Sequence, residues 1–158
     1  MPVTVRPATI VDAPTIAAFA QALSVEEGYP PPPLRAEHVR AEGFGPTPRF
    51  HVLIGELDGA ASGYALYYPA YDTDHAARGF YLQDLYVRPD ARRRGLGRAL
   101  MAALARACRA DGASYLFWNA LEQNRAARAF YRRLGAREER VLTLSLQQDA
   151  LGRLAEGD

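Results

Sequence analysis

The stretch YLQDLYVRPDARRRGLGRAL, residues 81–100, decides the fold because it passes from a strand through a loop into a helix. Residues 79–88 have the apolar density of a central strand buried on both faces, and Pro89 closes that strand. From residue 95 to 110, apolar residues recur on one helical face and arginines on the opposite face, which predicts an amphipathic helix. A strand that leads into such a helix is typical of α/β proteins.

The loop between this strand and this helix, residues 92–97, is rich in arginine and glycine. Unpaired backbone N–H groups and the positive end of the helix dipole meet there, and Gly95 and Gly97 permit positive φ angles and close approach of the backbone. Permanent positive charge comes from four arginines: Arg92, Arg93, Arg94 and Arg98. This combination predicts a diphosphate site, although the spacing differs from the dinucleotide G-x-G-x-x-G. The alternative is a solvated, Arg-rich helix start.

Hydrophobic periodicity and turn residues predict the remaining elements. Strands are expected at residues 3–6, 50–57, 60–68, 114–118 and 140–146, and helices at 13–23, 35–42, 124–134 and 148–155. Antiparallel hairpins come first, and strand–helix units that need parallel pairing follow. The pattern predicts an α/β (mixed α+β) fold with a central mixed, twisted sheet of six to seven strands and helices on both faces. A length of 158 residues predicts one domain, residues 1–158.

Two features of the composition exclude several classes of chemistry. All 19 basic residues are arginine, so the chain has no lysine for a Schiff base or for a phosphate-binding P-loop. Cys108 is the only cysteine, which excludes an intramolecular disulfide and a multi-thiolate zinc site, and it is interpreted as a core residue. The three histidines lack metal-ligand spacing, so no metal is expected. The absence of a long apolar run or a signal pattern predicts a cytoplasmic protein without membrane contact.

The charge is distributed unevenly along the chain. Residues 1–87 carry a net charge of −5, whereas residues 88–140 carry +8. This asymmetry favours an anionic ligand in the second half and a cationic one near the first half, with two solvated faces as the alternative. Nucleic acid is not the expected partner, because the arginines gather at one loop and on helices without interleaved exposed aromatic residues.

The R-x-x-G-x-G run at residues 92–97, after a strand end at Val87, resembles the acetyl-CoA motif of the GNAT N-acetyltransferase superfamily. Residues 124–135, N-x-x-A-x-x-F-Y-x-x-L-G, resemble its second signature, and residues 3–16 resemble its first strand and helix. Residues 79–97 and 116–136 are most similar to the diamine and polyamine branch, which includes spermidine/spermine and thialysine N-acetyltransferases. The resemblance covers nearly the whole chain and implies an N-acetyltransferase that functions as a homodimer.

The resemblance also implies where acetyl-CoA binds. It places the pantetheine arm in a cleft where the strands ending at Val87 and Trp118 splay apart, and the pyrophosphate on the loop amides. The implied cofactor-binding residues are Leu85, Tyr86, Val87, Arg92, Arg93, Arg94, Gly95, Leu96, Gly97, Arg98, Asn124 and Tyr131. Asn124 would contact the cofactor arm and is also a helix N-cap. Tyr131 would be the general acid that protonates the leaving thiolate, and its alternative is a core aromatic residue.

The acceptor implied by the resemblance is the primary amine of a diamine, a polyamine or a lysine-like amino acid, which attacks acetyl-CoA directly in a ternary complex. Its ammonium, with a pKa of about 10.4, must first lose a proton. The polyamine branch reads Tyr-Leu-Glu-Asp and uses the glutamate as base, but this chain reads Tyr81-Leu82-Gln83-Asp84. Gln83 cannot accept that proton, and adjacent strand residues face opposite sides unless a bulge re-aims Asp84.

Three possibilities for the base therefore stay open: Asp84, Glu26 or Glu27 acting through water, or a water relay in which Gln83 orients the amine. The expected catalytic residues are Tyr131, Asp84 and Gln83, and the expected substrate-binding residues are Glu26, Glu27, Gln83 and Asp84. Two alternative functions remain. One is acetyl transfer to a protein N-terminus. The other is acyl-CoA binding without catalysis, which the glutamine at position 83 would explain.

Overall fold

The computed structural model describes residues 2–157 and divides the chain into two compact units, Met1–Asn119 and Ala120–Asp158. The first unit contains the whole sheet and three α-helices, and the second contains two further helices. One domain spanning residues 1–158 stays a prediction.

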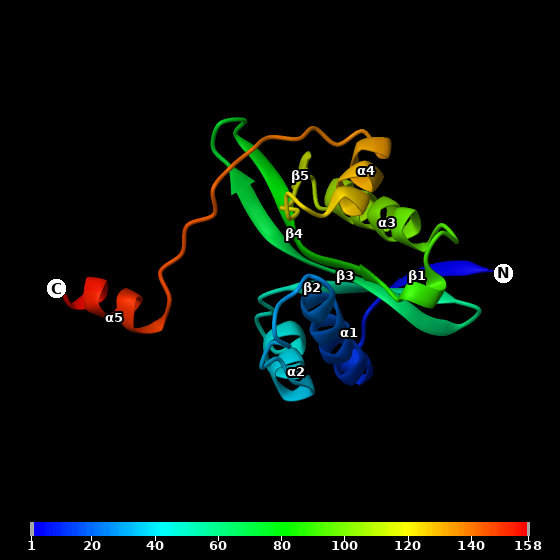
Figure 1. The fold of residues 1–158 in the computed structure, drawn as a ribbon, viewed down its shortest axis with the longest axis horizontal. Helices are drawn as coiled ribbons and strands as arrows, with labels where there is room; N and C mark the ends of the chain where they lie inside the picture. Colours follow the sequence, from blue (N-terminus) through cyan, green and yellow to red (C-terminus); the bar gives the residue numbers. More distant parts are fainter. Residues whose placement is uncertain (1, 158) are drawn as a thin grey trace. The chain divides into compact units, whose positions relative to one another are not determined.

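The first unit is built on a five-stranded sheet with the order β1-β2-β3-β4-β5 (Figure 1). The strands are β1 (Val3–Pro7), β2 (His51–Leu57), β3 (Ala60–Asp72), β4 (Ala77–Val87) and β5 (Tyr115–Phe117). The first four are antiparallel to their neighbours, and β5 runs parallel to β4. Helix α3 (Leu96–Ala110) makes the crossover that this parallel pair requires. The expected mixed α/β fold is confirmed, with five strands rather than six to seven.

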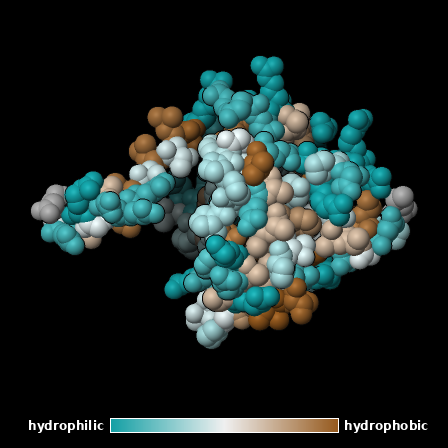
Figure 2. Space-filling view, turned by 60° about the horizontal axis from the view of Figure 1, so that its bottom comes forward, coloured by the Kyte–Doolittle hydropathy of each residue, from teal (hydrophilic) through white to brown (hydrophobic). Residues whose placement is uncertain are grey.

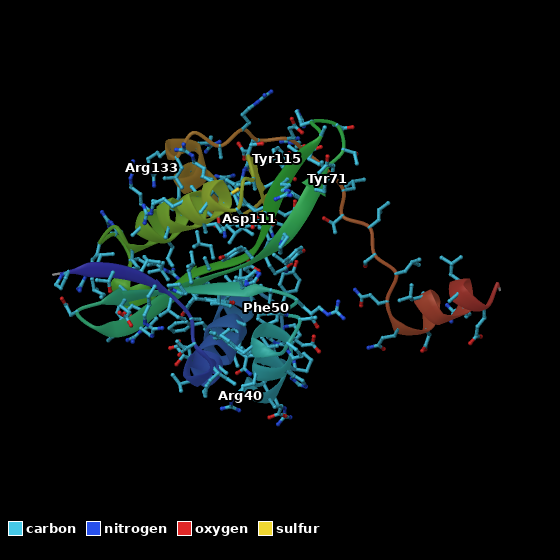
Figure 3. All side chains as sticks on the ribbon, turned by 180° about the vertical axis from the view of Figure 1, so that it is seen from behind. Arg40, Phe50, Tyr71, Asp111, Tyr115 and Arg133 are labelled. Carbon is cyan, nitrogen blue, oxygen red and sulfur yellow. The ribbon has the colours of Figure 1, made fainter. Side chains whose placement is uncertain are left out.

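Helices cover both faces of the sheet, with α1 (Ala13–Glu26) and α2 (Ala36–Phe44) on one face and α3 on the other (Figure 1). The core under α1 and α2 joins fully buried side chains from four elements, namely Ile16, Val39, Ile54 and Tyr64. Phe50, labelled in Figure 3, is partly buried against this core just before β2 begins. The burial of apolar side chains from α1, α2, β2 and β3 fixes these helices on the sheet.

On the other face, α3 lies close to β2 because Gly55 has no side chain. A Cβ atom at Gly55 would lie 2.8 Å from Leu96 Cδ1 and 3.2 Å from Leu100 Cδ1. Leu96 and Leu100 are themselves buried. Cys108 is also buried on this helix, and its Sγ lies 3.6 Å from the carbonyl oxygen of Tyr115. The interpretation of Cys108 as a core residue is confirmed.

The second unit contains α4 (Arg125–Arg133) and α5 (Gln148–Glu156), and residues 136–147 between them have no regular secondary structure. The strand expected at 140–146 is therefore wrong. Val141, Leu142 and Leu144 are 70%, 90% and 89% exposed. A strand needs a neighbouring strand for its backbone hydrogen bonds, and the described part of this unit contains none. Alternating apolar residues indicate one apolar face, but they do not supply that neighbour.

Polar residues cover most of the face seen in Figure 2, and the hydrophobic residues on it form small patches. Within residues 2–157, no helix combines the length and the apolar character needed to cross a membrane.

Three charged side chains tie β1, β2 and the start of α1 together. Arg6 donates hydrogen bonds from Nη1 and Nη2 to the two carboxylate oxygens of Asp12, at 2.8 and 2.9 Å, and from Nε to Glu56 at 2.8 Å. The backbone N–H of Thr9 also donates to Asp12, at 2.7 Å. Asp12 is only 8% exposed. The Arg6 guanidinium and the Thr9 amide lower the pKa of Asp12 to about 2.

We expect Asp12→Asn to lower the free energy of unfolding at pH 7 by about 1–2 kcal/mol, an amount reduced by the exposure of Arg6 to solvent. Because the folded-state pKa of Asp12 is depressed, this stabilisation is complete above the unfolded pKa of 3.8 and is lost as the pH falls through about 2. Urea unfolding at several pH values checks this. Asp90→Asn, in the exposed Arg88–Asp90 pair, is the control and should change little. If Asp12→Asn lowered the free energy of unfolding by the same amount at every pH, the expectation would be contradicted.

Candidate active site

The centre of β4 contains a β-bulge. Leu66 of β3 pairs with Asp84, but the next residue, Tyr67, pairs with Leu82. Gln83 is therefore one extra residue in β4 with no partner of its own in β3. A bulge of this kind places two consecutive residues opposite one residue of the neighbouring strand and interrupts the alternation of side chains.

The bulge brings the side chains of Gln83 and Asp84 to the same face of the sheet. The Tyr64 hydroxyl donates a hydrogen bond of 2.6 Å to Asp84 Oδ2, and the Tyr68 hydroxyl donates one of 3.4 Å to Gln83 Oε1. Tyr64 and Tyr68 are four residues apart on β3, so their side chains lie on one face. The structure thus contains a bulge that turns the Asp84 side chain to the face of Gln83.

Asp84 lies in an acidic environment made by α1, β3 and β4. Burial raises the pKa of Asp84, and the hydrogen bond from Tyr64 offsets part of this effect. The pKa of Glu27, just after α1, is also raised, first by burial and then by the negative charges of Asp84 and Glu26. Two carboxyl groups whose pKa values are both raised are suited to bind a cation or to accept a proton.

Glu26 has a different partner from Glu27. Its carboxylate accepts a hydrogen bond from Arg92 Nη2, and Arg92 Nε donates to the carbonyl oxygen of Val87 at 2.9 Å. The Arg92 guanidinium carbon also lies 6.0 Å from the centre of the Tyr86 ring. The structure therefore brings Glu26, expected near the substrate, to the loop that follows β4.

The loop before α3 has two residues with left-handed backbone, Arg93 with φ of 63° and Gly95 with φ of 86°. Helix α3 begins at Leu96, and no described side chain caps its N-terminus. Both Gly95 and Gly97 permit a positive φ, but only Gly95 of the two adopts it. Gly97 is the second residue of α3, where the helix itself requires negative φ.

The first turn of α3 leaves backbone donors for a ligand. The N–H of Ala99 bonds to the Gly95 carbonyl at 3.0 Å, so the N–H groups of residues 96–98 precede the first bond within the helix. The Leu96 side chain is buried against the sheet, so its backbone is the part suited to binding. The surrounding arginines are exposed: Arg92, Arg93, Arg94 and Arg98. This arrangement of amides and guanidinium groups can hold an anionic diphosphate.

Strand β5 pairs with only the first part of β4. Their pairing extends from Gly79↔Tyr115 to Tyr81↔Phe117, while β4 continues to Val87 without β5 beside it. The backbone of Leu85, Tyr86 and Val87 therefore lies in the part of β4 that β5 does not pair with. The Tyr86 side chain packs on Phe19 with ring centres 5.4 Å apart, so it belongs to the core under α1.

The sequence of this chain is similar to that of a known protein family. The model of the acetyltransferase (GNAT) family matches residues 16–136, which is more than half of the chain. The chain belongs to the GNAT acetyltransferase family.

The relatives of this GNAT protein include two mammalian enzymes. Thialysine N-epsilon-acetyltransferase of Bos taurus is 36% identical over 110 residues, which cover 65% of this chain and 64% of the bovine protein, just under two thirds of its length. The Mus musculus protein of the same name is 34% identical over 131 residues, covering 75% of this chain and 76% of the mouse protein. An integron cassette protein from the V. cholerae mobile metagenome superposes with a TM-score of 0.80 at 20% identity, covering 99% of both chains. The last similarity supports the fold alone.

The GNAT second signature lies in the second unit. The Asn124 side chain accepts a hydrogen bond of 3.1 Å from the N–H of Ala127, so Asn124 is the N-cap of α4 as expected. Tyr131 lies on α4, is partly buried, and its ring centre lies 5.2 Å from that of Phe130. The structure therefore places Asn124 and Tyr131 on one helix, and places Asp84 and the loop in the first unit.

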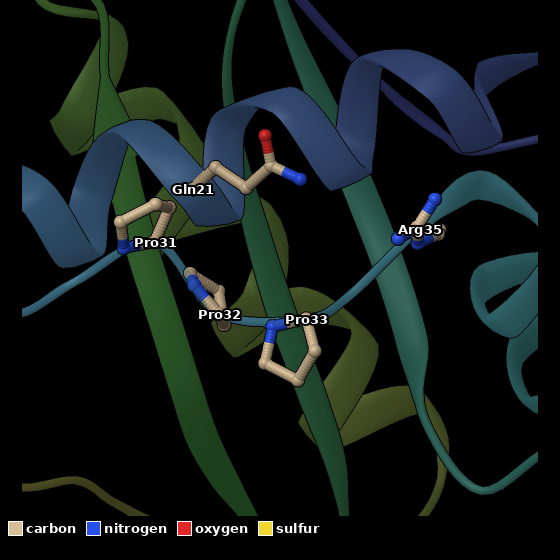
Figure 4. Close-up of a pocket in the computed structure, with 5 residues that line it drawn as sticks. All are labelled: Gln21, Pro31, Pro32, Pro33 and Arg35. Atoms are coloured by element: carbon tan, nitrogen blue, oxygen red, sulfur yellow. The ribbon is translucent and has the colours of Figure 1, made fainter.

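Two further observations concern ligands of this GNAT domain. Among residues 2–157, no three His, Cys, Asp or Glu side chains gather as a metal site. A pocket of about 260 Å³ lies between α1 and the proline run after it, lined by Gln21, Pro31, Pro32, Pro33 and Arg35 (Figure 4). Three of the four consecutive prolines that follow α1 line this pocket.

Proposed function

We propose that the protein is an acetyl-CoA-dependent N-acetyltransferase that acetylates the primary amine of a small molecule, a diamine, a polyamine or a lysine-like amino acid. The observation that carries the proposal is the half-buried Asp84 on β4, the strand that ends at the Arg- and Gly-rich loop before α3. A proton acceptor and a diphosphate site on consecutive elements suit acetyl transfer to an amine. The names of the bovine and mouse relatives, which specify the Nε of thialysine, support the same class of acceptor.

The residues present fit coenzyme A. The uncapped start of α3, the positive φ of Gly95 and the exposed side chains of Arg93, Arg94 and Arg98 suit its diphosphate. The edge of β4 at residues 85–87 that β5 does not pair with suits the amides of its pantetheine arm. Acetyl-CoA supplies a thioester whose acetyl group is activated for transfer. Arg92, held by Glu26, would shape the loop as well as add charge.

Asp84 is the base in this proposal. The acceptor ammonium gives a proton to Asp84, and the free amine then attacks the thioester carbonyl to form the amide bond. The carbon–sulfur bond breaks, and the nitrogen loses its second proton as the neutral amide forms. Tyr131, the acid that the resemblance implies, would give the thiolate its proton and would regain one from the proton that the nitrogen releases. Glu26 is engaged by Arg92, while Glu27 would attract the cationic acceptor. Gln83, beside Asp84 on the bulge, would orient the amine.

A second candidate function is acyl-CoA binding without catalysis, which the glutamine at position 83 favours. A third is transfer to a protein N-terminus. A panel of diamines, polyamines, lysine, thialysine and N-terminal peptides, incubated with acetyl-CoA and assayed for free thiol, separates these functions. Turnover of small amines is expected. Turnover of peptides only, or of no acceptor, would overturn the proposal. The homodimer and the cytoplasmic location stay predictions of the resemblance and of the sequence.

We expect Gly95→Asp to raise the Kd for acetyl-CoA by roughly tenfold or more, because a carboxylate at the helix start repels the diphosphate and occupies its amides. The matched control is Gly112→Asp at the other end of α3, where the backbone also has positive φ, 74° against 86°. Both variants should lose thermal stability, since both force a side chain into the left-handed region, and Gly112→Asp should lose at least as much because its carboxylate lies at the C-terminal end of the helix. Calorimetric titration and thermal melts measure both quantities. Equal affinity in the two variants would count against a diphosphate site at this loop.

We expect Asp84→Asn to lower kcat about 10²- to 10⁴-fold, because no group at this position can then accept the proton. In the wild type, kcat/KM should rise as the pH increases through a midpoint above the ordinary aspartate value of 3.8, since burial raises the pKa of Asp84. Glu27→Gln is the matched comparison and should raise KM more than it lowers kcat. The reverse order of effects would assign the proton transfer to Glu27.

We expect Tyr131→Phe to lower kcat roughly 100-fold or more with little change in the Kd for acetyl-CoA, because it removes the proton donor and keeps the ring. Tyr71→Phe, at a tyrosine that is 63% exposed on β3 (Figure 3), is the control and should have wild-type kcat. Steady-state kinetics with the best small amine measure both. An unchanged kcat in Tyr131→Phe would rule out its role as the acid.

A further inference from the structure

Tyr64 is the residue that holds the Asp84 carboxylate. Its side chain is fully buried, at 0% exposure, and its hydroxyl donates a hydrogen bond of 2.6 Å to Asp84 Oδ2. We infer that Tyr64 is a positioning residue that fixes the orientation of the Asp84 carboxylate and keeps it ready to accept the proton of the acceptor amine. This inference rests on the proposed function, in which Asp84 is the base.

The position of the Tyr64 hydroxyl is set by the core. The Tyr64 ring packs on Phe19 of α1 with ring centres 5.9 Å apart, and its backbone pairs with Tyr86 of β4. A close-packed ring with two side-chain torsions has little freedom, so its hydroxyl is a fixed point. Because Oδ2 of Asp84 is held by this hydroxyl, Oδ1 is the oxygen that would take the proton.

The two residues of the bulge are each held by a tyrosine of β3, but not equally. Gln83 accepts its hydrogen bond from the exposed end of Tyr68 at 3.4 Å, whereas Asp84 accepts from the buried Tyr64 at 2.6 Å. Hydrogen bonds to a charged acceptor are shorter and stronger than bonds between neutral groups. The hydrogen bond from Tyr64 is therefore the one that can orient the Asp84 carboxylate and stabilise its ionised form.

The electrostatics around Asp84 explain why it needs this donor. Burial raises the pKa of Asp84, and the Tyr64 hydroxyl counteracts it by stabilising the ionised form. Burial and the charge of Asp84 raise the pKa of Tyr64 far above its ordinary value, so its hydroxyl stays protonated and donates to the Asp84 carboxylate. The other titratable groups that interact with this pair are Glu27, just after α1, and Tyr81 and Tyr86 from β4. Of these, Glu27 is acidic and the two tyrosines are neutral at pH 7.

The test compares the wild type with Tyr64→Phe and with Tyr67→Phe, which removes a hydroxyl from a buried tyrosine on the opposite face of β3. In Tyr64→Phe, the acidic limb of the kcat/KM profile should move up by about one pH unit, which lowers the rate about tenfold below the midpoint. The Kd for acetyl-CoA should not change, and Tyr67→Phe should keep the wild-type profile. 3-Fluorotyrosine at position 64 is a more acidic phenol of similar shape, so it should move the acidic limb of the profile to lower pH. This variant provides the test if Tyr64→Phe does not fold.

A measurement without turnover separates this inference from the proposed function. Carbon-13 NMR titration of the Asp84 carboxyl group should give a higher pKa in Tyr64→Phe than in the wild type. If the wild type transfers acetyl to no amine, the proposed function fails, while the titration still decides whether Tyr64 controls Asp84. If Asp84→Asn abolishes transfer and neither the titration nor the acidic limb moves in Tyr64→Phe or the fluorotyrosine variant, the role of Tyr64 is overturned.

Discussion

One extra residue in β4 is the constraint on which the proposed chemistry of this protein depends. Without the bulge at Gln83, strict alternation would send the side chains of Gln83 and Asp84 to opposite faces of the sheet. With it, both reach the face covered by α1, where a buried tyrosine holds the carboxylate. The bulge thus brings Asp84 to the face that Gln83 also reaches, within hydrogen-bond distance of Tyr64.

The same strand connects this carboxylate to the loop before α3, and the packing of α3 makes that loop suited to anions. Leu96 and Leu100 are buried above Gly55, so the first turn of the helix cannot rotate without breaking the core. The amides ahead of the first intrahelical bond are therefore held in place by apolar packing and not by a capping side chain. A site built in this way needs little reorganisation on binding, because its donors are fixed before the ligand arrives.

The fold was largely predictable because its signals are local. The amphipathic pattern of α3 gives that helix nearly the expected bounds, and the loop motif before it was recognised from its residues. The strand expected at 140–146 fails because apolar alternation says nothing about a pairing partner. At the site, the candidates Asp84 and Glu27 were identified from their chemistry. The hydrogen bond from Tyr64 was not predictable, because it depends on register between β3 and β4 and not on spacing along the chain.

A half-buried carboxylate is expensive for a small domain, and this cost itself argues for a function. Replacing Asp84 by an apolar residue would relieve the penalty of burying an ionisable group, whereas the chain also places a buried tyrosine beside it as a donor. In the Arg6–Asp12–Glu56 network the opposite holds, because the guanidinium lowers the pKa of Asp12 and the pair stabilises the fold. Asp84 has no such arginine, and its proton affinity is raised rather than lowered. A carboxyl group in that state is poorly suited to hold the protein together and well suited to exchange a proton with an amine.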